Sequence, residues 1–407
     1  MGAGTSLNQP ESPLLYVGTY QAGYPRNRLM IEAFRRAGFK VLELNVAVWD
    51  TASTGGKRGG WFGWSRARLA VNFLAAYPRL IRGVARNLRA ASALVIGYPG
   101  QVDMLVLAPL AKLWRKPVVF NPLVTLTDTV IEDRELANAS SVTGRCVKLV
   151  DRLALKLADL VIVDTAENGD YIVRHFDMPA ERIVVVPVGA DADLFDPGHY
   201  PERSLTVDRP LRVLFYGKYI PLHGVETILR AAKILQDANA PVVLDLVGSG
   251  QTYAEMRHLA NSLSLTNVRF LDPVPFAELP ERLASADVVL GIFGKTMKAG
   301  RVVPNKVFQA MAMGSAIVTR RSNPIEAVLR DHESALLVEP GSAEELAAAI
   351  LELRDERLRL RLGNAARQAY VDHAAPEIMA ERAGRAMREL LCQTRERARL
   401  LGFGSAR

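Results

Sequence analysis

The chain has 407 residues, 49% of them hydrophobic, and a formal net charge of +8. This length exceeds one ordinary core and predicts two domains of about 200 residues each. No apolar run is long enough for a signal peptide or a membrane span. Cys146 and Cys392 show no metal-ligand spacing and are expected to be buried small side chains in a reducing compartment. The sequence therefore predicts a cytoplasmic protein, with peripheral attachment to the cytosolic face of a membrane left open.

The N-terminal part alternates short apolar strands with helices. Strands are expected at 14–17, 40–45, 93–96, 117–120, 160–163 and 183–186, and helices at 27–37, 79–89 and 144–158. Apolar strands joined by helical crossovers predict a parallel sheet with helices on both faces. We expect this Rossmann-like domain to cover residues 1–196. The polar, proline-rich residues 197–210 are expected to link it to the rest of the chain.

The positive charge is concentrated between Asp50 and Asp103, where no acidic residue occurs. The basic residues of this interval are Lys57, Arg58, Arg66, Arg68, Arg79, Arg82, Arg86 and Arg89. Eight positive and no negative residues give +8, which equals the excess of the whole chain.

The same interval has the pattern of an amphipathic segment. In a helix over 79–89, the four arginines share one face, and Ile81, Val84 and Leu88 lie on the opposite face. Aromatic residues precede this helix at Trp61, Phe62 and Trp64. This combination favours contact of residues 57–89 with an anionic membrane surface over a purely structural helix. Nucleic-acid binding ranks last because no nucleic-acid-binding module is recognisable.

Two strands in the C-terminal part end in glycine and lead into helices. The strand 211–216 runs into Gly217 and Lys218, and the loop that follows ends at His223 before a helix over 225–235. The strand 242–247 stops at Gly248, and a third loop follows over 294–309. Free backbone N–H groups at a helix start suit a phosphate. We therefore expect a nucleotide-binding domain over 211–375, and a C-terminal helix over 376–407 that returns toward the N-terminal domain.

Five segments match a set of motifs. They are residues 158–165, 187–191, 285–290, 304–314 and 332–338. Together they resemble the retaining nucleotide-sugar glycosyltransferases of the GT-B fold, in particular family 4, in which the last segment is a hairpin. The resemblance implies two Rossmann-like, doubly wound α/β domains that face each other across a cleft. It also implies a hexosyltransferase-like enzyme that needs no metal or other cofactor, with a nucleotide diphospho-sugar as donor substrate.

The chain departs from this family at the donor motif. The usual pair of glutamates falls on Arg301 and Gln309. A glutamine carbonyl can still accept a hydrogen bond from ribose, whereas an arginine cannot replace a carboxylate that holds sugar hydroxyls. Contacts to the donor sugar are therefore expected from the backbone of 294–300. The diphosphate pair maps onto Lys218 and His223, and Lys306 can supply a further positive charge.

The predicted site residues fall into three groups. The catalytic group is Lys218, His223, Lys306 and Asp128. The donor-binding group is Gly18, Gly217, Gly248, Val274, Gly294, Arg301, Asn305 and Gln309, with the base contacted near 272–276. The acceptor group is Tyr98 and Asp103, which with Asp128 are expected on loops that face the cleft. For Arg301, contact with phosphate and a plain surface charge are equally supported.

The basic aromatic segment favours an acceptor that is lipid-linked or presented at a membrane, in exopolysaccharide, glycolipid or other glycan biosynthesis. Transfer to a soluble small-molecule acceptor fits as well. Two other functions stay open. A nucleotide-sugar epimerase of similar fold would need acid and base groups that the sequence does not place. A non-catalytic partner subunit is suggested by the loss of both motif glutamates.

Overall fold

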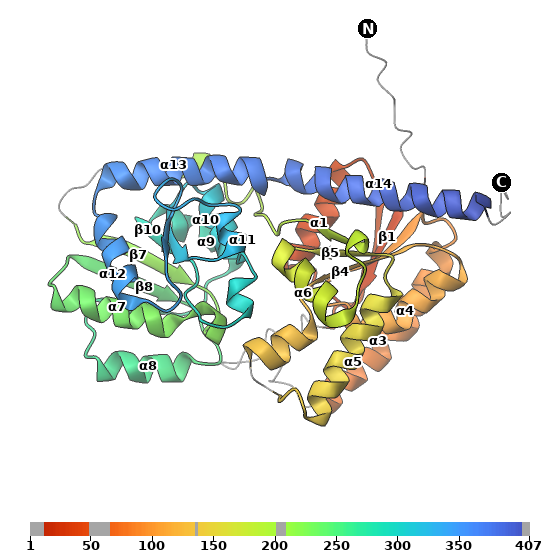
Figure 1. The fold of residues 1–407 in the computed structure, drawn as a ribbon, viewed down its shortest axis with the longest axis horizontal. Coiled ribbons are helices and arrows are strands. Elements are labelled where there is room, and N and C mark those ends of the chain that lie inside the picture. The colour runs from red at the N-terminus through yellow and green to blue at the C-terminus, as the bar shows by residue number, and fades with distance from the viewer. Residues whose placement is uncertain (1–11, 49–65, 135–136, 201–208, 401–407) are drawn as a thin grey trace, which may run out of the picture.

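Two six-stranded parallel sheets make up the framework of this computed structural model, which describes residues 12–48, 66–134, 137–200 and 209–400. The N-terminal sheet has the order β2-β1-β3-β4-β5-β6 and the C-terminal sheet the order β12-β11-β10-β7-β8-β9. Figure 1 shows the two domains side by side, with α13 and α14 running along both. The predicted α/β fold of two doubly wound domains is therefore confirmed.

The N-terminal sheet consists of apolar strands that are mostly buried on both faces. Its strands are β1 (Leu14–Gly18), β2 (Val41–Asn45), β3 (Ala93–Ile96), β4 (Val118–Leu123), β5 (Leu160–Val163) and β6 (Ile183–Val185). The helices between them are α1 (Pro25–Arg36), α3 (Arg66–Asn87), α4 (Gln101–Leu113), α5 (Val142–Leu157) and α6 (Ala166–Phe176). Helices α3 to α6 share one core cluster on one face, while α1 packs with the C-terminal helix on the other.

The C-terminal sheet also consists of apolar, mostly buried strands joined by helices. Its strands are β7 (Leu211–Tyr216), β8 (Val242–Val247), β9 (Val268–Leu271), β10 (Val288–Leu290), β11 (Ala316–Arg320) and β12 (Leu336–Val338). Its helices are α7 (Val225–Asp237), α8 (Tyr253–Ser262), α9 (Leu279–Ala284), α10 (Asn305–Ala312), α11 (Asn323–Glu326), α12 (Ala343–Glu352) and α13 (Glu356–His373). The last helix, α14 (Pro376–Leu400), packs on α1 of the N-terminal domain.

Three sequence predictions are wrong in detail. Cys146 and Cys392 are exposed, because each lies on the outer face of a helix. The segment 332–338 is no hairpin, since its only strand, β12, pairs in parallel with β11. The apolar face of α3 is formed by Leu80, Val84 and the following Leu88, whereas Ile81 is 38% exposed. A residue one position away from the buried row lies about 100° around the helix, which turns Ile81 away from the sheet.

The aromatic residues Trp61, Phe62 and Trp64 lie outside the described residues, as do Lys57 and Arg58. Helix α3 itself ends at Asn87, so Arg89 follows the helix instead of belonging to its face. Among the described helices, none combines the length and apolar character that a bilayer span requires.

Candidate nucleotide-sugar site

The loops after β7 and β10 lie side by side in the C-terminal domain. These strands are neighbours in the sheet, but the chain leaves β7 toward β8 on one side and β10 toward β11 on the other. Such a switch in direction leaves a crevice for ligands at the carboxyl ends of the strands. Gly224, at φ +63°, begins α7, and its Cα lies so close to the backbone of Gly294 that a side chain would collide with it. The glycines therefore bring the two predicted donor loops together.

Lys306 places a buried amino group at this crevice. It lies in the first turn of α10 and is 5% exposed. Its Nζ is 3.9 Å from the ring centroid of Phe215 and has no hydrogen-bond partner in the structure. Burial lowers the pKa of Lys306 well below its usual range. Gly217, at φ +143°, brings its backbone so near that an added Cβ would lie 3.0 Å from this Nζ.

The imidazole of His223 lies beside Lys306. Its Nδ1 contacts the backbone oxygen of Lys218, and its ring packs edge-on against Phe215 with centroids 5.7 Å apart. Burial, and then the charge of Lys306, lower the pKa of His223 well below its usual value. The ring is therefore neutral at pH 7, and its single hydrogen is on Nδ1, which donates to the Lys218 oxygen, so Nε2 can donate to a phosphate oxygen only when the ring is protonated. Lys218 itself is exposed on the same loop.

Gln309 does not point freely into the crevice. It is 4% exposed, and its Oε1 accepts a hydrogen bond of 2.8 Å from the hydroxyl of Tyr216. One turn earlier, Asn305 is half-buried at the start of α10. Gly248 lies against the backbone of Gly217, which joins the loops after β7 and β8. Val274 is half-buried in the loop after β9, which is the strand beyond β8 in the sheet.

Arg301 lies with carboxylates of the N-terminal domain instead of with the basic residues around Lys306. Its guanidinium forms ion pairs with Asp128 and, at 2.7 Å, with Glu132. It stacks over the ring of Tyr171 at 4.2 Å. The alternative of a plain surface charge is wrong, because the side chain is 12% exposed and bridges the two domains, while the phosphate contact stays a prediction. Asp128 begins the short π-helix η1 (Asp128–Asp133), so it too is not on an open loop.

The two predicted acceptor residues lie in different environments. Asp103 is buried in the first turn of α4, where it accepts hydrogen bonds from Thr19 and, at 3.0 Å, from Tyr77. The prediction that it faces the cleft from a loop is wrong, because the tight approach of Gly18 encloses its carboxylate. Tyr98 is half-buried and packs against the ring of Tyr24, with centroids 5.0 Å apart, beside a core cluster that both domains share.

Four residues at the domain interface were not among the predicted site residues. They are Glu132, Arg134, Tyr171 and Lys298. Lys298 Nζ lies 3.1 Å from Asp128 and 2.9 Å from the Thr129 hydroxyl. Their positions in the sequence match no motif. The only available signal was the pair of cations, Lys298 and Arg301, within the third ligand-like loop.

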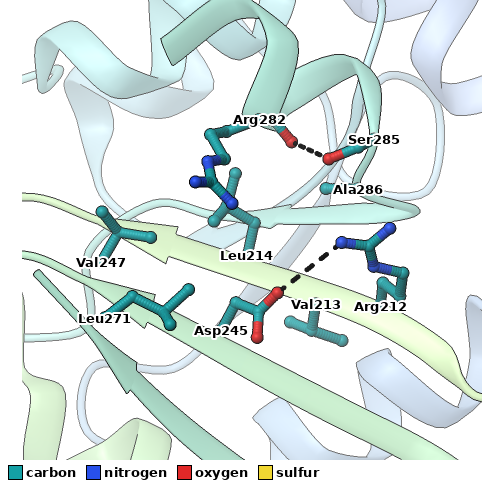
Figure 2. A pocket seen from close by; sticks show the side chains of 9 residues that line it. All are labelled: Arg212, Val213, Leu214, Asp245, Val247, Leu271, Arg282, Ser285 and Ala286. Atoms are coloured by element: carbon teal, nitrogen blue, oxygen red, sulfur yellow. Dashed lines mark hydrogen bonds and ion pairs between the residues drawn. The ribbon is translucent and has the colours of Figure 1, made fainter. Parts of the chain in front are cut away.

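Two cavities among the described residues lie away from this crevice. Figure 2 shows the first, which is lined by Arg212, Asp245 and neighbouring residues of the C-terminal sheet. At about 10 Å³ it has room for about one water molecule. The second, of about 500 Å³, lies along α1 and is lined by charged residues such as Arg28 and Glu43. In the described ranges no three histidine, cysteine or acidic side chains are grouped as a metal site would need.

Sequence comparison finds two family profiles along the chain. One, described as glycosyl transferase 4-like domain, matches residues 22–189, and the other, glycosyl transferases group 1, matches residues 210–356. D-inositol 3-phosphate glycosyltransferase of Corynebacterium glutamicum is 28% identical over 292 residues. The aligned part is 68% of this chain and 65% of that relative's length.

Solved structures show the same fold. Sucrose-phosphate synthase from Thermosynechococcus elongatus matches with a TM-score of 0.70 and 20% identity over 94% of this chain and 100% of that one. Anabaena Alr3699/HepE in complex with UDP-glucose matches with a TM-score of 0.67 and 16% identity over 93% and 100%. Both domains of the chain therefore match in sequence and in fold, and the chain belongs to the family-4-like glycosyltransferases of the GT-B fold.

Proposed function

We propose that this protein is a retaining, hexosyltransferase-like enzyme that moves a sugar from a nucleotide diphospho-sugar to an acceptor. The observation that carries the proposal is the buried, unpartnered Nζ of Lys306 at the start of α10. A buried basic group without a counter-ion is costly unless a ligand supplies the negative charge. The relatives agree with such a ligand, since one is named a glycosyltransferase and another was solved with UDP-glucose.

The basic residues would act on the leaving group. During transfer the anomeric carbon becomes cationic and negative charge grows on the departing diphosphate. Lys306 and Lys218 would donate to that diphosphate, and His223 would do so in its protonated form, so these residues would stabilise the transition state more than the ground state. We propose that this arrangement replaces a metal ion.

The proposed reaction retains the configuration of the anomeric carbon. The acceptor oxygen bonds to that carbon from the face that the diphosphate leaves, and the bond to the phosphate oxygen breaks. The acceptor proton passes to an oxygen of the leaving diphosphate, so no protein nucleophile is needed. An NMR spectrum of the product would show the same anomeric configuration as the donor, and an inverted product would contradict this part of the proposal.

The proposed acceptor is lipid-linked or membrane-presented, as in exopolysaccharide or glycolipid synthesis on the cytosolic face of a membrane. Helices α3 and α5 each expose large apolar side chains. They are Val71, Leu74 and Ile81 on α3, and Val142, Leu149 and Leu153 on α5. Basic residues accompany them at Arg79, Arg82 and Arg86 on α3 and at Arg145, Lys148, Arg152 and Lys156 on α5. Apolar side chains among positive charges suit an anionic lipid surface.

Calorimetric titration with UDP, GDP and ADP tests the donor site. One diphosphate is expected to bind, and Lys306→Ala to weaken it at least about tenfold, as loss of a charged hydrogen bond implies. Lys233→Ala is the matched control, since Lys233 pairs with Asp237 on the surface of α7. Absence of binding by the wild type to all three would refute the proposal and favour a non-catalytic partner subunit.

Sedimentation with lipid vesicles tests the membrane surface. The wild type is expected to bind vesicles that contain phosphatidylglycerol more than pure phosphatidylcholine vesicles. The double change Leu74→Ser and Leu149→Ser should reduce that binding, because it removes apolar area from both helices. Leu360→Ser, at an exposed site on α13 of the other domain, is the control. Equal binding by all three proteins would rule out this surface.

A nucleotide-sugar epimerase remains the second enzymatic candidate, and the products of the reaction separate the two. Incubation of the nucleotide sugar without acceptor would give a second nucleotide sugar in an epimerase. A transferase would leave it unchanged, apart from slow hydrolysis.

A further inference from the structure

We propose that Asp128 and Glu132 of the N-terminal domain bind the hydroxyl groups of the donor sugar in place of the motif carboxylate that Arg301 replaces. Lys298 and Arg301 are then positioning residues that hold these two carboxylates. The inference rests on the proposed nucleotide-sugar function and names the residues that bind the sugar of the donor.

At this domain interface the positive charge lies in the C-terminal domain and the negative charges lie in the N-terminal domain. This chain has Arg301 at the sequence position where the family has a carboxylate. The guanidinium of Arg301 forms ion pairs with two carboxylates from η1 of the other domain. Lys298 adds a second cation, 3.1 Å from Asp128. The hydroxyl of Thr165 donates a 2.6 Å hydrogen bond to the backbone oxygen of Arg301. Carboxylates thus contact Arg301, the residue at the sequence position of the missing one, although they belong to the opposite domain.

The position of each carboxylate is held by more than one contact. Glu132 accepts from the Tyr171 hydroxyl at 2.6 Å through Oε1 and pairs with Arg301 at 2.7 Å through Oε2. Its side chain is 29% exposed, whereas that of Asp128 is 2% exposed. Carboxylates fixed in this way accept short, strong hydrogen bonds from hydroxyls without first losing conformational freedom. Glu132 is the more accessible of the two.

Two guanidinium nitrogens at this cluster donate no hydrogen bond. They are Nε of Arg301 and Nε of the adjacent Arg134, which lies 3.5 Å from Asp133 Oδ2. Asp128 Oδ2 pairs with Lys298 Nζ at 3.1 Å. Buried polar atoms are nearly always satisfied in folded proteins, because leaving one without a partner is unfavourable. A sugar hydroxyl both donates and accepts, so it can satisfy a carboxylate oxygen and a guanidinium N–H together.

A purely structural function would be a latch that keeps the two domains together. The two functions differ in what they predict for ligands. A latch affects every ligand that the closed site holds, including a bare nucleotide diphosphate. Carboxylates that bind the sugar affect the affinity only of ligands that contain the sugar.

The test compares UDP, GDP and ADP with UDP-glucose, UDP-N-acetylglucosamine, GDP-mannose and ADP-glucose by calorimetry. Asp128→Asn and Glu132→Gln should each weaken the preferred nucleotide sugar about tenfold or more while leaving its bare diphosphate within about twofold. Glu377→Gln is the control, because it removes an ion pair between α1 and α14 outside the crevice. Lys306→Ala should weaken both kinds of ligand.

Three results would overturn the inference. The variants could bind the nucleotide sugar like the wild type, they could lose both ligands equally, or the wild type could bind no nucleotide sugar more tightly than its diphosphate. Failure of the wild type to bind any diphosphate would instead refute the proposed function.

Charge reversal gives a second measurement. Arg301→Glu alone should abolish the sugar preference, since it places three carboxylates together, and Asp128→Arg in the same chain should restore part of it. Arg301→Lys should keep the sugar preference, because it retains the positive charge. A double variant no better than either single change would show that the pair does not act as a unit.

Discussion

Arg301 and Lys306 are two cations five positions apart that have opposite environments. Arg301 is neutralised by Asp128 and Glu132, whereas no ion pair in the described part of the chain involves Lys306. The free basic group is therefore the one suited to an incoming anion, and the paired one is suited to holding carboxylates in place. Under the two proposals, Lys306 would bind the diphosphate and Arg301 would hold the carboxylates that bind the sugar.

Asp103 is a buried carboxylate that the N-terminal domain uses internally. Burial raises its pKa from 3.8 to about 6, although Thr19 and Tyr77 donate hydrogen bonds to it. A raised carboxyl pKa means that the folded protein holds its proton more tightly than the unfolded chain. The resulting stabilisation is present below pH 4 and is lost as the pH rises through about 6.

The Asp103→Asn variant tests this dependence. The unfolding free energy of the wild type, relative to the variant, should fall by about 2 kcal/mol between pH 4 and pH 7. Urea unfolding at several pH values measures the difference. Glu255→Gln, on the exposed side of α8, is the control. A difference that stays constant with pH would mean that the Asp103 carboxyl titrates normally.

At the scale of elements, α14 is fitted closely to α1. Gly384 is the contact point, since a Cβ added there would lie 2.6 Å from the Cβ of Ala37. Around it, Met379, Ala383 and Met387 are almost completely buried. A glycine inside a helix usually lowers stability relative to alanine, so its presence here reflects the close approach of the two helices.

Gly384→Val is expected to destabilise the protein by about 2 kcal/mol, because the added side chain overpacks the α1–α14 contact. Thermal or urea unfolding measures the loss. Gly23→Ala serves as the comparison, as an added Cβ there meets nothing within 4 Å. Equal stability of Gly384→Val and the wild type would show that α14 can shift without cost.

At the scale of the whole molecule, the C-terminal helix α14 completes the hydrophobic core of the N-terminal domain. Helix α14 follows α13 of the C-terminal domain and then covers one face of the N-terminal sheet. The ion pairs between η1 and Arg301 also join the domains. So does the hydroxyl of Tyr370, which donates a 3.1 Å hydrogen bond to the backbone oxygen of Ala190.

Removal of residues 376–407 should therefore destabilise the N-terminal domain. Met379, Met387, Leu390 and Leu391 are each at most 9% exposed. At about 1.5 kcal/mol for each large side chain, the loss would be about 6 kcal/mol. Calorimetry should show a lower melting temperature, and Met387→Ala should show part of the same decrease. An unchanged melting temperature in the truncated chain would contradict the prediction.

The sequence by itself determined the order and type of most strands, the parallel sheets, and the helix that has Lys306 in its first turn. Apolar runs bounded by glycine specify strands through neighbouring residues, so these features can be read locally. Gly217 and Gly224 could be recognised as turn positions for the same reason.

Only the tertiary structure decided the partners of the charged residues. Arg301 meets Asp128 from 173 positions away, and Asp103 meets Thr19 from 84 positions away. No local pattern in a single sequence encodes which distant side chain will neutralise a charge. Likewise, the exposure of Ile81 and the fit of Gly384 depend on the packing of whole elements, which is settled only when the sheets and helices come together.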